Sequence, residues 1–251
     1  MTPPTRPALI ALADGTTFQG HCVAGSGEVF GEMVFNTSMT GYQEILTDPS
    51  YAGQMVTMTY PHIGNYGVTP EDDESSRPHV RAFVMKQCCR RPSNQRATSG
   101  LVEYMEEHGV IGVEDIDTRQ LVRHVRTEGA MNAAVSTTET DPEALVERAR
   151  AWEGLEGRDM AGEVTCEETY VVEPESEARA HVVAYDFGIK RSIVRKLVEA
   201  GCRVTVVPAR TSAQEALAHK PDGIFLSNGP GDPRPLDYAI ATTRQLIETA
   251  D

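Results

Sequence analysis

The stretch that decides the fold of the C-terminal half covers residues 181–233 and reads HVVAYDFGIKRSIVRKLVEAGCRVTVVPARTSAQEALAHKPDGIFLSNGPGDP. Short apolar runs alternate in it with amphipathic segments, which is typical of a buried parallel sheet joined by right-handed β-α-β crossovers. The strands are predicted at 181–185, 203–207 and 223–226, and the helices at 189–200, 212–219 and 237–250.

This pattern stops early. Three parallel strands are expected in residues 181–251, and the last predicted helix has no strand to return to. Because a parallel sheet is normally covered on both faces, we expect an incomplete domain here.

The N-terminal half has another organisation. Short β-branched segments bounded by Gly, Asp and Pro predict strands, and Ser99, Asp117 and Asp141 are candidate N-caps of three helices. The strands are expected at 8–12, 17–22, 32–35, 54–58 and 81–85, and the helices at 99–107, 118–127 and 142–152. The whole chain is therefore predicted to be α/β, with an α+β domain at 1–153, an acidic linker at 154–180 and the incomplete domain at 181–251.

Composition excludes several classes of function. The 251 residues include 23 basic and 37 acidic side chains, a net charge of −14, which would repel the phosphates of a nucleic acid. No run approaches the ~20 apolar residues of a membrane span, so we expect a cytoplasmic protein without a membrane partner. Five cysteines and no cluster with metal-ligand spacing argue against disulfides and against a metal site.

The strongest local motif is Ser227-Asn228-Gly229-Pro230-Gly231-Asp232-Pro233. It follows a predicted strand, at the edge where open parallel sheets bind their ligands. Its glycines permit positive φ and close backbone approach, and could present N–H groups to a developing anion. An ordinary strand-to-helix turn explains the same residues equally well.

A second polar block covers residues 36–51 and ends in the turn Asp48-Pro49-Ser50. Ser50 could donate a hydrogen bond to a ligand, although a plain polar surface loop is the simpler interpretation of this block. Asp117 is explained by helix capping rather than by acid–base chemistry. Cys88 and Cys89 have no histidine nearby in the sequence and are expected to be strand-end thiols rather than nucleophiles.

Together these segments resemble the small, glutamine-hydrolysing subunit of carbamoyl phosphate synthetase. The matching stretches, in chain order, are LADGT at 12–16, GEMVFNTSMTGYQEILTDPSY at 31–51, TYPHIGN at 59–65, DIDTR at 115–119, VAYDFG at 183–188 and LSNGPGDP at 226–233. The NGPGD motif is shared by class I glutamine amidotransferases generally, including those of anthranilate and GMP synthesis. The N-terminal block is specific to the carbamoyl phosphate family and argues against those other pathways.

The resemblance implies a doubly wound amidotransferase sheet, of which residues 181–251 would supply the first three β-α units. It also implies that glutamine is hydrolysed and that ammonia passes to a large subunit, which makes carbamoyl phosphate from bicarbonate and ATP for pyrimidine and arginine synthesis. By the same resemblance, the Gly229 N–H is an oxyanion donor, and Ser50, Gly229 and Gly231 bind glutamine. No cofactor is implied for this subunit, whereas ATP and Mg²⁺ are implied for the large one.

The family's nucleophile lies in a Gly-x-Cys-x-Gly turn on the next strand, and its His and Glu follow later. None of the five cysteines here has that context. The resemblance therefore implies half of a glutamine site without the catalytic Cys, His and Glu. The alternative is a non-catalytic module that docks on the large subunit or senses glutamine.

Overall fold

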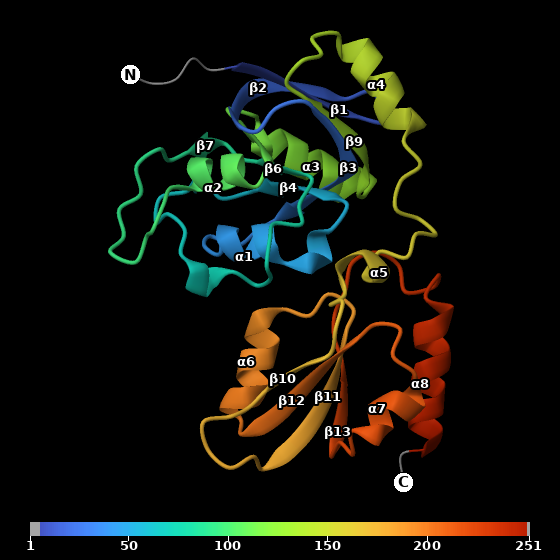
Figure 1. The fold of residues 1–251 in the computed structure, drawn as a ribbon. Helices are drawn as coiled ribbons and strands as arrows, with labels where there is room; N and C mark the ends of the chain where they lie inside the picture. Colours follow the sequence, from blue (N-terminus) through green and yellow to red (C-terminus); the bar gives the residue numbers. More distant parts are fainter. Residues whose placement is uncertain (1–5, 250–251) are drawn as a thin grey trace. The chain divides into compact units, whose positions relative to one another are not determined.

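The computed structural model describes residues 6–249, which belong to two compact units (Figure 1). Unit 1 comprises the described residues up to 47 together with 53–154. Unit 2 comprises 155–249 together with the short segment 48–52. The second unit is thus discontinuous in sequence.

Unit 1 is built on a closed barrel of seven strands. The neighbouring pairs among four consecutive strands, β3 (Glu28–Asn36), β4 (Gln54–Met58), β6 (Ala82–Val84) and β8 (Ile111–Glu114), are parallel, and the other pairs are antiparallel. A separate parallel pair joins His62–Ile63 (β5) to Gln87–Cys88 (β7). In their order around the barrel, the strands are β1 (Arg6–Leu12), β2 (Thr17–Ala24), β8 (Ile111–Glu114), β6 (Ala82–Val84), β4 (Gln54–Met58), β3 (Glu28–Asn36) and β9 (Met131–Ser136).

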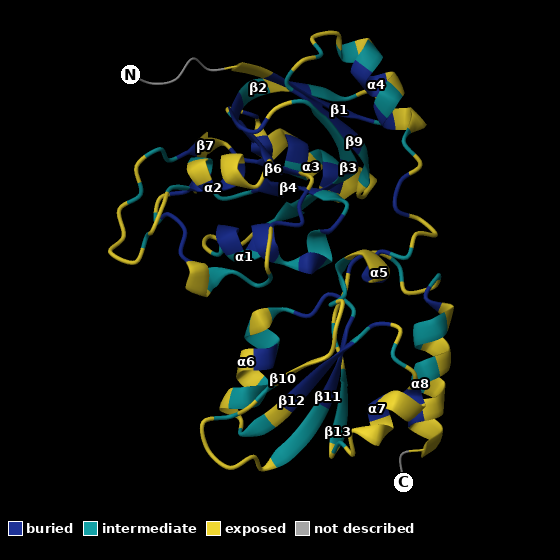
Figure 2. Ribbon diagram, in the orientation of Figure 1, coloured by how far each residue is buried: buried dark blue, intermediate teal, exposed yellow. Residues whose placement is uncertain are grey.

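Burial on both faces explains why β1 is a continuous apolar run. Ala8, Ile10 and Leu12 point into the barrel, whereas Leu9 and Ala11 pack against helix α4 (Pro142–Ala151) on the outside. Since successive side chains of a strand point to opposite faces, a strand covered on both sides needs apolar residues throughout. Figure 2 shows this part of the barrel as buried.

The helices of unit 1 are α1 (Tyr42–Thr47), α2 (Leu101–Glu107), α3 (Thr118–Glu128) and α4 (Pro142–Ala151). Asp117 and Asp141 cap α3 and α4 as predicted, by accepting from the N–H groups of Gln120 and Glu143. The predicted cap at Ser99 is wrong. Gly100 holds the N-cap position of α2 without a side-chain bond, and the Ser99 carbonyl accepts from Val68 N–H.

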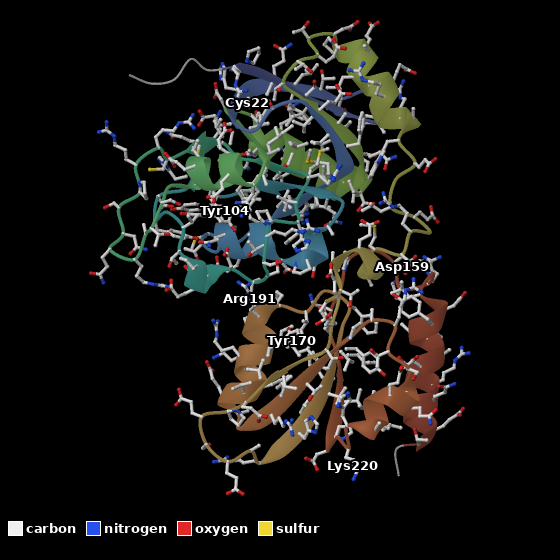
Figure 3. The ribbon with its side chains drawn as sticks, in the orientation of Figure 1. Cys22, Tyr104, Asp159, Tyr170, Arg191 and Lys220 are labelled. Carbon is white, nitrogen blue, oxygen red and sulfur yellow. The ribbon has the colours of Figure 1, made fainter. Side chains whose placement is uncertain are left out.

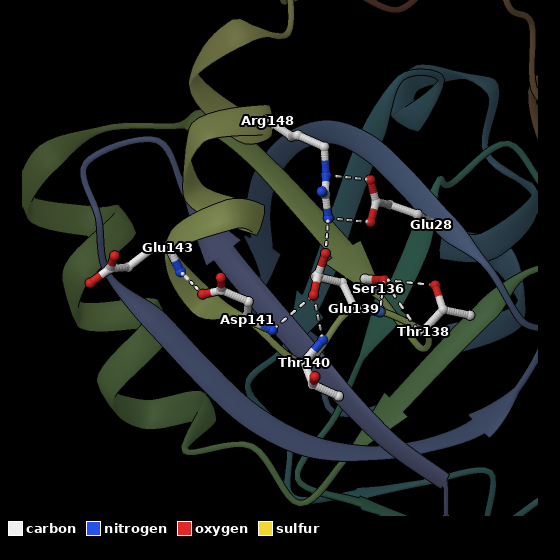
Figure 4. A network of polar contacts seen from close by, with 8 residues as sticks. All are labelled: Glu28, Ser136, Thr138, Glu139, Thr140, Asp141, Glu143 and Arg148. Carbon is white, nitrogen blue, oxygen red and sulfur yellow. Dashed lines mark hydrogen bonds and ion pairs between the residues drawn. The ribbon is translucent and has the colours of Figure 1, made fainter.

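Helix α4 is fixed to the barrel by a charged network (Figure 4). Arg148 contacts Glu28 of β3 at 2.9 Å and Glu139 of the β9–α4 loop at 3.0 Å. Glu139 also accepts from the N–H groups of Thr140 and Asp141. One guanidinium therefore joins the helix, a barrel strand and the loop between them.

Unit 2 is a four-stranded sheet with helices on both faces (Figure 1). The parallel strands and their helices agree with the first three units of a doubly wound amidotransferase sheet, so the predicted fold class is confirmed. The strands in spatial order are β10 (Tyr170–Val172), β12 (Cys202–Pro208), β11 (Ala180–Asp186) and β13 (Gly223–Leu226), and the helices are α5 (Ala161–Val164), α6 (Arg191–Glu199), α7 (Ala213–Ala218) and α8 (Asp237–Thr249).

The two faces of this sheet carry separate cores. Val183 and Tyr185 of β11 pack with Leu246 of α8 and with α7, whereas Ala184 packs with Val194 of α6 on the opposite face. Alternation along β11 therefore assigns one face to α6 and the other to α7 and α8.

The segment expected to be an acidic linker differs from that expectation. Residues 161–164 form α5, and Tyr170–Val172 form β10, which pairs antiparallel with β12 and makes a fourth strand. The backbone of the apolar cluster at 170–172 pairs with β12 at the edge of the sheet. This pairing orders the cluster although its flanking residues are acidic.

Candidate active site

The candidate site lies in unit 2, at the carboxyl ends of β11 and β13. Three segments meet there: the loop after β13, the turn that follows β11, and residues 48–52. Open parallel sheets bind ligands at this edge because the loops after adjacent strands diverge and leave a crevice. The loop after β13 carries the motif that the sequence singles out.

Gly229 is required by a close backbone contact. A Cβ atom added to Gly229 would lie 2.2 Å from the Phe187 carbonyl oxygen, a separation that real atoms do not adopt. The expectation of positive φ holds for Gly231, with φ +74°, but not for Gly229, which is absent from the positive-φ glycines of the described chain. The two glycines thus serve different geometric needs.

The loop is tied to the turn after β11 through Ser227. Its hydroxyl accepts from Phe187 N–H at 3.0 Å and donates to the Asn228 carbonyl at 2.7 Å. Among the described residues, none accepts a hydrogen bond from Gly229 N–H. The loop is therefore held in place while this N–H group remains available.

Ser50 lies beside this loop. It sits in a single 3₁₀ turn (Pro49–Tyr51), where Asp48 accepts from Ser50 N–H at 2.9 Å. The side-chain amide of Asn228 donates to Ser50 Oγ at 2.6 Å, across 178 residues of sequence. The structure thus brings together the two motifs that the sequence kept apart, because Ser50 meets the loop that contains Gly229 and Gly231.

Two charged groups that the sequence analysis did not single out also belong here. Lys190, at the start of α6, lies 3.5 Å from the Asp48 carboxylate. Asp186, only 6% exposed, accepts from the N–H groups of Gly188 and Ile189 through Oδ1 and from Cys166 N–H through Oδ2. An Asp at the end of a strand and two residues before a Gly is typical of a turn in which the carboxylate accepts backbone N–H groups. This signal in the sequence could have identified Asp186.

A cavity of about 470 Å³ opens beside the glycine loop. Phe187, Pro230, Leu236 and Ile240 make much of its wall apolar, and the ionisable residue of its lining is Arg244. Within the part of the chain that the structure describes, neither Cys nor His lines it. Its lining residues are Ala161, Phe187, Ser227, Gly229, Pro230, Gly231, Pro233, Leu236, Ala239, Ile240, Thr243 and Arg244.

The thiols whose pKa is shifted are not activated for attack. Burial raises the pKa of Cys88 to about 12, and burial together with the Asp186 carboxylate raises the pKa of Cys166 to about 12. Burial also raises the pKa of Cys22. A nucleophilic cysteine needs a lowered pKa or an adjacent base, so the raised pKa values of these three thiols do not favour a nucleophilic role.

Metal-binding clusters and membrane-spanning helices are both absent from the described part of the chain. Across residues 6–249, no group of His, Cys, Asp and Glu side chains could hold a metal ion. None of the helices in that range is both long and apolar enough to cross a membrane.

Comparisons with known proteins identify two family matches along the chain. Residues 10–135 match the family model of the carbamoyl-phosphate synthase small chain, CPSase domain, and residues 183–250 match glutamine amidotransferase class-I. The glycine loop and the turn after β11 fall within the second match.

Curated relatives extend the similarity over nearly the whole chain. The carbamoyl phosphate synthase small chain of Syntrophotalea carbinolica is 54% identical over 252 residues, which cover 96% of this chain and 67% of the relative. Those of Pseudomonas syringae pv. tomato and Escherichia coli K12 are 50% and 49% identical, and the chain covers 69% and 68% of their lengths. The resemblance seen in the sequence is thereby confirmed: the chain belongs to the carbamoyl phosphate synthase small chain family.

Proposed function

We propose that this chain is the glutamine-binding part of a glutamine-hydrolysing carbamoyl phosphate synthase small subunit. It would hold glutamine and supply the ammonia that a large subunit uses, with bicarbonate, ATP and Mg²⁺, to make carbamoyl phosphate for pyrimidine and arginine synthesis. The chain itself would need no cofactor, and its partners would be the large subunit and glutamine, in the cytoplasm. The 2.6 Å contact between Asn228 and Ser50 supports this proposal most directly.

Each site residue has a role that its geometry permits. The Ser50 hydroxyl accepts from Asn228, so its own proton is available for a glutamine polar group. Gly229 N–H points from a fixed loop and can stabilise the oxyanion that forms when the side-chain amide is attacked. Gly231, with its positive φ, lets the loop turn closely around the substrate.

The nucleophile is proposed to be absent from these 251 residues. None of the cysteines stands in a Gly-x-Cys-x-Gly turn. The pKa values of Cys22, Cys88 and Cys166 are raised rather than lowered. We therefore expect the 251-residue chain to release no ammonia from glutamine. An enzymatic ammonia assay with a buffer control checks this, and ammonia release abolished by a thiol alkylator would contradict it.

Binding tests the proposal directly. L-Glutamine should shift the amide NMR signals of Gly229 and Gly231 in the isotope-labelled chain, and Ser50→Ala should weaken that response. D-Glutamine and L-glutamate are the matched ligand controls, since they alter the stereocentre or the reacting amide. Equal responses to all three ligands, or none to L-glutamine, would overturn the glutamine site.

A further inference from the structure

The segment 159–164 lies at the wall of the cavity and is attached to the sheet by side chains rather than by strand pairing. Ala161 lines the cavity, and both Met160 and Ala161 are 1% exposed. Asp159, the first residue of this segment, is labelled in Figure 3. What fixes Asp159 therefore also fixes one wall of the site.

Asp159 is held by three groups from different parts of unit 2. Its Oδ2 lies 2.5 Å from the guanidinium of Arg210, a residue in the loop that follows β12. Its Oδ1 accepts from the Tyr238 hydroxyl of α8 at 3.2 Å and from Gly162 N–H at 2.8 Å. The Arg210 guanidinium also lies 4.2 Å above the centre of the Tyr238 ring. We call Asp159, Arg210 and Tyr238 the clamp.

The clamp reaches the glycine loop through the next residue. Met160 packs beneath Gly231, where an added Cβ would lie 3.0 Å from Met160 Cγ. Gly231 has φ +74°. Because glycine has no side chain, no packing of its own can hold it in this conformation. Ser227 and Asn228 hold the start of the loop through hydrogen bonds, and Met160, next to Asp159 in the chain, supplies a side-chain contact at Gly231.

Building on the proposed glutamine site, we propose that Asp159 is a positioning residue: through Met160, the clamp fixes the Gly229–Gly231 turn in its ligand-binding conformation. No clamp residue needs to touch the substrate for this role. Loss of the clamp should loosen the turn while the sheet, whose core lies in separate clusters, stays intact.

The test is a set of variants in the 251-residue chain, measured by ¹⁵N relaxation. Rigid backbone gives order parameters of about 0.85 and flexible backbone values below about 0.6. Asp159→Ala should lower the order parameters of Gly229 and Gly231 from the rigid to the flexible range, without changing those of Val183 and Val204. Tyr238→Phe removes one bond and should produce a smaller decrease.

Two further variants separate positioning from general stability. Asp159→Asn keeps an acceptor for Tyr238 and Gly162, so it should restore most of the order that Asp159→Ala loses. Glu173→Ala is the matched control, because it removes an exposed ion pair of the same unit, with Arg203 at 3.0 Å, away from the loop. It should leave the glycine turn unchanged.

The outcomes decide between the explanations. Unchanged order at Gly231 in folded Asp159→Ala, or an equal loss at Gly231 and Val183, would overturn the inference. If Asp159→Ala does not fold, Tyr238→Phe decides by the same comparison. L-Glutamine titration is measured separately: wild-type protein that ignores glutamine would contradict the proposed function, whereas the order parameters would still test the clamp.

Discussion

At the scale of single residues, the site depends on glycines that are constrained in different ways. Gly229 faces the Phe187 carbonyl, so any side chain collides with backbone. Gly231 needs a left-handed φ, so any other residue is strained even where space exists. Gly223, in β13, has neither constraint, since nothing lies within 4 Å of its added Cβ and its φ is not positive.

Gly231→Ala should destabilise unit 2 by about 1–3 kcal/mol, the usual cost of a non-glycine residue in a sparsely populated backbone conformation. Gly223→Ala is the matched control and should stay within about 0.5 kcal/mol of wild type. Native-state amide exchange of the β11 core measures both changes. Equal effects of the two substitutions would contradict the assignment of strain to Gly231.

Gly229→Ala tests the oxyanion role in a chimera that joins these residues to the part of the Syntrophotalea carbinolica relative outside the match. Alanine keeps the N–H group, but its Cβ would collide with the Phe187 carbonyl oxygen, so the loop must shift and carry this N–H away from the oxyanion. Loss of one oxyanion donor typically lowers kcat by about 100- to 1,000-fold. With the large subunit, synthesis from glutamine should fall by this amount, whereas synthesis from free ammonia should persist. An equal fall in both reactions would show that Gly229 only shapes the loop.

At the scale of elements, local signals in the sequence were sufficient for most helices and for the parallel strands. Asp117 and Asp141 identified two helix starts, and the run 223–226 identified β13 before its loop. The closure of the barrel could not be predicted, because β1 pairs with β9 more than a hundred residues later. The Lys190–Asp48 pair was missed for the same reason.

The network around α4 predicts a pH dependence for unit 1. Hydrogen bonds from Asp141 N–H and Arg148 hold the pKa of Glu139 below its usual value of 4.5. Because the folded-state pKa is the lower one, this stabilisation is present above pH 4.5 and is lost as the pH falls through the folded pKa.

Scanning calorimetry of wild type and Glu139→Gln should therefore show a difference in the unfolding temperature of unit 1 that shrinks as the pH is lowered from 6 to 3. The control is Glu147→Gln on the same helix. The Glu147 side chain is 71% exposed, and its partner Arg150 also lies on the surface. A difference that stays constant over this range would exclude Glu139 as the titrating group.

At the scale of the whole molecule, the two units differ in how their sheets end. The barrel of unit 1 closes on itself and has no edge strand. In unit 2, β13 is an edge strand with Leu226 41% exposed, and its sheet has four strands. Small sheets with an open edge bury less apolar surface to offset the entropy of ordering the chain.

Limited trypsin digestion should therefore remove residues 159–251 first and leave a resistant fragment that ends near Arg158, whose neighbours Glu156 and Gly157 are exposed. Mass spectrometry of the digestion products over time checks this order. Cleavage of the barrel at the same rate as unit 2 would show that the two units are equally stable.

Because unit 2 is discontinuous in sequence, its two segments are synthesised at different times. Ser50 and Asn228 are 178 residues apart, and ribosomes add about 5–20 residues per second. Ser50 is therefore synthesised roughly 10 to 35 seconds before the loop that it contacts. A nascent chain can complete its barrel in this interval, whereas Ser50 gains its contact with Asn228 only after the loop that follows β13 has been synthesised.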